Sequence, residues 1–209
     1  MIRFNPGLDY ITDRLPTNDE INKFLAEADR YKRQQMLKYK SMYNLTTFVE
    51  TGSFLGDTIE EMRHHFNDVY SIELDMGYAI NLMRRFKGVS NVHLTFGDSS
   101  VFLKSLMSNI PHENILFWLD AHAGNPIRDT KNPTQNYRGL MGVGQYDFSG
   151  LIELEYLLNL ELKNCVIMVD DIGDDPGKVC IHGGCGCINE LMRIAPNCEL
   201  EMSVARIKV

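Results

Sequence analysis

The chain has 209 residues, of which 44% are hydrophobic and 23% charged, and its formal net charge is −7. This length and composition are typical of a soluble globular protein with a single domain over residues 1–209. Because an acidic chain repels a phosphate backbone and no apolar run approaches the roughly 20 residues that cross a bilayer, we expect neither a nucleic-acid nor a membrane partner. No secretion signal is expected either, and the predicted location is cytoplasmic.

Residues 1–45 are predicted to form a helical extension. Apolar residues recur at helical spacing from Ile21 to Tyr31 and predict a helix over about residues 18–43. The basic cluster on this helix, from Arg30 to Lys40, is interpreted as a solvated helix face.

Short apolar runs then alternate with helical patterns. The predicted strands are Thr47–Thr51, Val69–Leu74, Val92–Phe96, Ile115–Leu119, Cys165–Val169 and Leu200–Lys208. The predicted helices are Asp57–His65, Tyr78–Phe86, Ser99–Met107, Ser149–Leu160 and Asn189–Ile194. Strands that alternate with helices form parallel sheets joined by crossover helices. We therefore predict an α/β fold with a doubly wound, mostly parallel, Rossmann-like sheet.

Ligands of such sheets bind outside the carboxyl ends of the strands. Acidic residues lie at or near five of these ends, namely Glu50, Glu73, Asp98, Asp120 and Asp170. These positions are where we look for a binding site.

A glycine turn follows the first predicted strand. Gly52 and Gly56 allow the backbone to turn tightly and to approach a ligand, and the next helix start favours an anionic group. The spacing is neither the GxGxxG fingerprint nor a P-loop. Glu73 could accept both hydroxyls of a ribose, and Asp98 could meet an adenine edge. Each feature alone also fits an ordinary turn or a solvent-facing acid, but together they predict a nucleoside site.

Four motifs resemble the class I S-adenosylmethionine (SAM)-dependent methyltransferases, and especially the bacterial branch that contains macrocin O-methyltransferase-like enzymes. They are Glu-Thr-Gly-Ser-Phe-Leu-Gly-Asp-Thr at 50–58, Tyr-Ser-Ile-Glu-Leu at 70–74, Gly-Asp-Ser at 97–99 and Phe-Trp-Leu-Asp-Ala-His at 117–122. The resemblance covers about residues 47–171. It implies a Rossmann-like methyltransferase sheet with SAM as the cofactor.

The resemblance also implies the cofactor-binding residues. Those near the methionine end of SAM, or in the same turn, are Glu50, Gly52, Ser53, Gly56, Asp57 and Thr58. Glu73 would bind the ribose, and Asp98 and Ser99 would lie by the adenine.

Carboxylates and a histidine at two adjacent strand ends form the predicted reaction centre. Asp120 and His122 follow the fourth strand, and Asp170 and Asp171 follow the fifth. Three carboxylates suit a hard cation such as Mg²⁺, although Asp120 could instead contact SAM while the aspartate pair caps the next segment. The resemblance implies Mg²⁺ on Asp120, Asp170 and Asp171, which would lower the pKa of an acceptor hydroxyl.

The predicted catalytic residues are Asp120 and His122. His122 could be the general base, a metal ligand or the residue that orients Asp120. The catechol type of the family has a lysine three residues after the aspartate, whereas Ala123 stands there in this chain. The identity of the base therefore stays open.

Residues 121–148 are predicted to form an acceptor loop, because a polar stretch of this length is usually a lid or a binding loop. The resemblance implies O-methylation of a small hydroxylated acceptor, such as a sugar or a natural product. The alternatives are the same reaction without a metal, a metal-dependent hydroxylase that would use His122 and the more remote His182, and a non-catalytic nucleoside-binding module.

Two features near the C-terminus remain open. Three cysteines between Cys180 and Cys187, with His182, either bind zinc or are free thiols in a glycine-rich loop. Residues 199–209 supply one clear strand where the family has two. Either a strand is missing, or the cysteine segment replaces it, or a homodimer completes the sheet.

Overall fold

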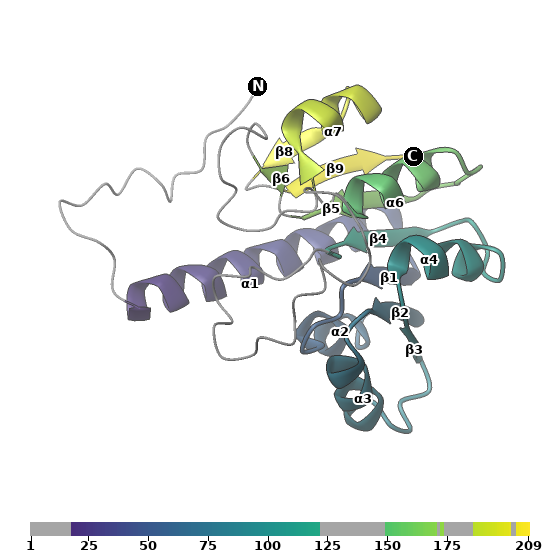
Figure 1. The fold of residues 1–209 in the computed structure, drawn as a ribbon. Helices are drawn as coiled ribbons and strands as arrows, with labels where there is room; N and C mark the ends of the chain where they lie inside the picture. Colours follow the sequence, from purple (N-terminus) through teal and green to yellow (C-terminus); the bar gives the residue numbers. More distant parts are fainter. Residues whose placement is uncertain (1–17, 122–148, 171, 174–185, 202–203) are drawn as a thin grey trace, which may run out of the picture.

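The computed structural model describes residues 18–121, 149–170, 172–173, 186–201 and 204–209 (Figure 1). Its centre is a seven-stranded sheet with the order β3-β2-β1-β4-β5-β9-β8. The strands are β1 (Thr47–Thr51), β2 (Asp68–Glu73), β3 (Val92–Phe96), β4 (Ile115–Leu119), β5 (Val166–Val169), β8 (Glu199–Glu201) and β9 (Val204–Lys208). The helices are α1 (Asn18–Tyr43), α2 (Asp57–Met62), α3 (Met76–Arg85), α4 (Ser99–Met107), α6 (Ser149–Leu158) and α7 (Ile188–Ile194).

The first five strands are parallel and in register, which confirms the predicted α/β fold. β1 pairs with β2 on one side and with β4 on the other. All residues of β4 and β5 are buried, as expected for strands covered on both faces. The chain moves from β1 outward to β3 and then returns to β4, so the direction of winding reverses between β1 and β4. Ligands of doubly wound sheets bind at this switch point.

Two apolar layers cover the sheet. Leu103 of α4, Leu154 of α6 and Leu191 of α7 pack on one face, against Phe117 and Ile167. On the other face, helices α1, α2 and α3 pack through Met36, Ile59, Met62, Leu82 and Phe86. Side chains alternate between these layers along each strand, because successive Cβ atoms of a strand point to opposite faces.

Helix α1 runs antiparallel to β5. The carbonyl of Tyr43, its last residue, accepts a hydrogen bond from Asn164 Nδ2 at 2.8 Å, just before β5 begins. The first half of α1 therefore extends past the carboxyl ends of β4 and β5, as Figure 1 shows. None of the described helices is long and apolar enough to span a bilayer.

The expectation of a single last strand was wrong. The segment forms two antiparallel strands, β8 and β9, in which Glu201 pairs with Val204. β9 is also antiparallel to β5, so both final strands lie in the sheet of one chain. The sequence alternates through this region without a glycine or proline to mark the turn, which explains the error. A partner chain is not needed to complete the sheet.

Two smaller differences concern local structure. The helix predicted over Asp57–His65 ends at Met62, and its last residues form turns. A second sheet of two short strands, β6 (Ile172–Gly173) and β7 (Gly186–Cys187), was not predicted.

Candidate functional site

The glycine turn after β1 lies against the end of β4, at the switch point of the sheet. Gly52 has φ +83°, and a Cβ added to it would lie 2.5 Å from the carbonyl oxygen of Asp120. The Gly52 amide donates to the carbonyl of Ile72 at 2.9 Å. Both the left-handed conformation and the close approach require glycine here. The turn therefore holds the end of β1 against the ends of β2 and β4, at the place where ligands of doubly wound sheets bind.

Glu73, at the end of β2, holds this turn through two backbone amides. Phe54 N–H donates to Oε2 at 2.8 Å, and Asp75 N–H donates to Oε1 at 2.7 Å. A carboxylate offers about four lone pairs, so Glu73 retains acceptor capacity for hydroxyl donors. Burial raises the pKa of Glu73, and the two amide hydrogen bonds oppose that rise. The predicted ribose residue thus lies beside the predicted methionine-end turn.

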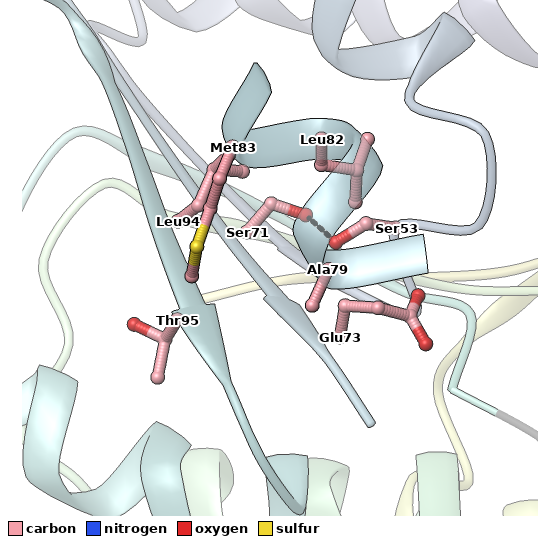
Figure 2. Close-up of a pocket in the computed structure, with 8 residues that line it drawn as sticks. All are labelled: Ser53, Ser71, Glu73, Ala79, Leu82, Met83, Leu94 and Thr95. Atoms are coloured by element: carbon pink, nitrogen blue, oxygen red, sulfur yellow. Dashed lines mark hydrogen bonds between the residues drawn. The ribbon is translucent and has the colours of Figure 1, made fainter. Parts of the chain in front are cut away.

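A chain of hydrogen bonds runs behind the turn to Glu50. Ser53 Oγ and Ser71 Oγ lie 2.6 Å apart (Figure 2). Ser71 Oγ also lies 2.6 Å from Glu50 Oε2. Glu50 is 2% exposed. Burial raises the pKa of Glu50 to about 8; the Ser71 hydrogen bond opposes this rise, and the nearby charge of Glu73 adds to it. Ser71, which the sequence reading missed, connects two predicted site residues.

Figure 2 also shows the crevice between β2, β3 and α3. Its lining includes Ser53, Ser71 and Glu73 together with the apolar Leu82 and Leu94. The crevice has no space for a water-sized molecule. It is therefore a packed wall behind the turn and offers no cavity for a ligand.

Asp98 and Ser99, the predicted adenine residues, point in different directions. Asp98 caps α4, since its Oδ1 accepts from Ser100 N–H at 2.9 Å. Ser99 is 7% exposed, and its hydroxyl donates to Glu153 on α6. The Ser99 hydroxyl is therefore engaged inside the protein, while Asp98 lies half-buried at the strand end.

Glu153 is a buried carboxylate that the sequence reading missed. It is 1% exposed, and it accepts from Ser99 Oγ and, at 2.7 Å, from Thr51 Oγ1. It thereby ties α6 to the end of β1 and to the start of α4. A single carboxylate between Leu151 and Leu154 in an apolar helix is the signal that could have identified it.

Replacing Glu153 with alanine should lower the free energy of unfolding by about 2–4 kcal/mol, because two buried hydroxyls lose their acceptor. Chemical denaturation measures this loss. Glu155→Ala is the matched control, since Glu155 is exposed on the same helix and its carboxylate is 3.9 Å from Arg193 Nη2. Equal losses in the two variants would contradict the bridging role of Glu153.

Asp57, the first residue of α2, is linked to the glycine turn by Arg85, which also donates to the carbonyl of Leu55 at 2.7 Å. The Asp57 carboxylate lies 2.9 Å from Arg85 Nη1, and 69% of the side chain is exposed. It lines an open groove of about 550 Å³ on the outer side of α1 and α2, where Arg33 also pairs with Glu61. The predicted cofactor-binding roles of Asp57 and of Thr58, which is half-buried in the first turn of α2, stay predictions.

Asp120 and Asp170 lie at neighbouring strand ends, as predicted. They follow Leu119 and Val169, which pair in register. Asp170 is 3% exposed and points to the α1 face, where Lys32 Nζ lies 2.6 Å from its Oδ2. The positively charged ammonium of Lys32 thus already lies at the Asp170 carboxylate, where a Mg²⁺ ion would bind. Asp170 therefore does not fit the predicted role of a Mg²⁺ ligand. Lys32 also shows that the basic cluster of α1 is not entirely a solvated face.

Several predicted residues lie outside the described part of the chain. They are His122, Asp171, the acceptor loop beyond Ala121, and the cysteine segment with Cys180, His182 and Cys185. Within the described residues, no three His, Cys, Asp or Glu side chains are placed to hold a metal ion.

Exposed apolar side chains surround the ends of β2 and β3. Leu74, Phe96 and Phe102 are 48%, 42% and 39% exposed. A Cβ on Gly97 would lie 2.2 Å from the Phe102 ring, so this ring packs directly on the turn before Asp98. These exposed apolar side chains, together with the carboxylate of Asp98, suit the adenine ring of the predicted nucleoside ligand.

No family model and no curated protein matches the chain. Among solved structures, the O-methyltransferase from Bacillus cereus in complex with SAH matches with a TM-score of 0.56 at 12% identity, over 96% of each chain. The N-methyltransferase NodS from Bradyrhizobium japonicum WM9 matches with a TM-score of 0.50 at 12% identity, over 87% of this chain and 96% of its own. The chain spans only 46% of the 23S rRNA methyltransferase ErmE. The chain therefore has the α/β fold of SAM-dependent methyltransferases.

Proposed function

We propose that the chain is a SAM-dependent methyltransferase. The observation that carries this proposal is the contact of the left-handed Gly52 turn with Asp120 at the switch point, next to the buried carboxylate of Glu73. The turn brings the end of β1 against the end of β4, at the place where ligands of doubly wound sheets bind, and the acid one strand away can accept ribose hydroxyls.

In this proposal the methionine end of SAM lies along residues 52–56, the ribose on Glu73 and the adenine between Asp98 and the apolar surface of Leu74 and Phe102. Exposed apolar side chains lie at Phe96 of β3 and Phe102 of α4, and they support the position of the adenine. Phe54 and Leu55 of the turn are exposed apolar side chains as well, whereas the polar Glu50 and Ser71 are buried behind the turn.

The transferred methyl group would point toward the ends of β4 and β5. Asp120 lies there beside the turn, and we propose that it orients or deprotonates the acceptor. The acceptor class, a small hydroxylated molecule methylated on oxygen, rests on the sequence resemblance. Because Asp170 is paired with Lys32, we do not include this residue in the proposed Mg²⁺ site. The other two predicted ligands of the metal, Asp120 and Asp171, stay predictions.

Calorimetric titration with SAM tests the proposal. We expect wild-type binding in the micromolar range and a loss of about 10–100-fold in Glu73→Gln, because the charged acceptor of the ribose is removed. Glu113→Gln is the matched control, since Glu113 is exposed and precedes β4, at the amino ends of the parallel strands and so far from the proposed site.

Absence of binding of both SAM and its demethylated product would disprove the proposal. Binding without methyl transfer to any hydroxylated acceptor would instead favour the nucleoside-binding module.

A further inference from the structure

The ion pair between Lys32 and Asp170 joins helix α1 to the reaction end of the sheet, by which we mean the carboxyl ends of β4 and β5, where the predicted reaction centre lies. Only 17% of the Lys32 side chain and 4% of the Asp170 side chain are exposed. Burying two charges costs desolvation, and apolar residues of similar volume would attach the helix at least as well. Attachment alone therefore does not account for a charged pair at this place.

The position of Lys32 is set by the packing of α1. Met36, one helical turn later, is 1% exposed and packs in the same core as Trp118 of β4 and Met168 of β5. Residues four apart lie on one face of a helix, so the burial of Met36 directs Lys32 toward these two strands. Figure 1 shows α1 lying along them, with its N-terminal half extending past their carboxyl ends.

The ammonium and a divalent metal compete for the same carboxylate. Mg²⁺ binds carboxylate oxygens at about 2.0–2.1 Å, whereas Asp170 Oδ2 already contacts Lys32 Nζ at 2.6 Å. A divalent ion on this oxygen would therefore lie beside a like charge. Asp120, across the register pair Leu119–Val169, is the neighbouring strand-end carboxylate.

We propose that the ammonium of Lys32 is the fixed cation of the reaction end and that it excludes Mg²⁺ from Asp170. Its charge would stabilise the oxyanion that forms when an acceptor hydroxyl loses its proton. This last step rests on the proposed methyltransferase function, whereas the exclusion of Mg²⁺ does not.

Thermal unfolding with and without MgCl₂, in the absence of SAM, tests the proposal. In about 10 mM MgCl₂ we expect no change in the Tm of the wild type, and a rise of about 3–5 °C in Lys32→Met, where the carboxylates have lost the ammonium. Adding Asp170→Asn to Lys32→Met should remove the rise. A purely structural role of Lys32 predicts lower stability without any response to Mg²⁺.

Lys38→Met is the matched control, because it removes the same charge from an exposed position of the same helix. A Mg²⁺-dependent rise in the wild type that Asp170→Asn abolishes would overturn the proposal, and so would a folded Lys32→Met variant without a rise. Should Lys32→Met not fold, Lys32→Gln takes its place, because it also removes the ammonium, and the same rise in Tm is expected. Since SAM is absent, the result is independent of whether methyl transfer occurs.

Discussion

Replacing Gly52 with alanine is expected to lower the free energy of unfolding by about 3–4 kcal/mol and to weaken SAM binding by at least about 100-fold. The left-handed conformation alone costs alanine about 1 kcal/mol. The larger cost comes from the backbone of β4, because the new Cβ would lie 2.5 Å from the Asp120 oxygen and 2.8 Å from its carbonyl carbon. Relief requires β1 and β4 to separate at the switch point, where we propose that SAM binds.

Gly88→Ala provides the control for this experiment. Gly88 has φ +81°, almost the same as Gly52, but a Cβ added there would meet nothing within 4 Å. The free energy of unfolding of Gly88→Ala should fall only by the conformational cost of about 1 kcal/mol, and the variant should retain SAM binding. Chemical denaturation and calorimetric titration measure both effects. If Gly52→Ala behaves like Gly88→Ala, the turn is not pressed against β4 as the structure shows.

The elements that the sequence predicted best have short-range signals. Val92–Phe96, Ser99–Met107 and Ile115–Leu119 have the predicted bounds. Asp98 marks the start of α4 because its carboxylate caps the free amide of Ser100, and such a capping aspartate is visible in the sequence. Parallel neighbouring strands have their carboxyl ends at the same side of the sheet, so acids at those ends lie close together. The placement of Glu50, Glu73 and Asp120 around the turn was therefore predictable.

The contacts that decide the chemistry join residues far apart in the chain, and no local pattern encodes them. Ser99 bonds Glu153, 54 positions away, which turns its hydroxyl from the predicted adenine site. Lys32 and Asp170 are 138 positions apart. Nothing nearby distinguishes Lys32 from the other basic residues of α1; only the packing of the helix on the sheet selects it.

The ionisation of Glu50 should make stability depend on pH. Its pKa is raised from 4.5 to about 8 in the folded chain, mainly by burial. Between these values the folded state holds a proton that the unfolded state has lost, so its contribution to stability falls as the pH rises and is constant above about pH 8. Glu50→Gln, which mimics the protonated form, should therefore be more stable than the wild type by about 2–4 kcal/mol at pH 9 and similar to it near pH 4.5.

Binding of SAM should reverse the preference of Glu50 for its neutral form. The cofactor carries positive charge on its sulfonium and its amino group, and an opposite charge nearby favours the carboxylate. We expect wild-type affinity for SAM to rise between about pH 6 and pH 8, by up to about tenfold per pH unit, with release of a proton on binding. Titrations in buffers of different ionisation enthalpy measure this release. Glu50→Gln should lose it, whereas Glu161→Gln, at an exposed position before β5, should retain it. Equal proton release in both variants would show that Glu50 does not sense the cofactor, and its raised pKa would then belong to the packing behind the turn alone.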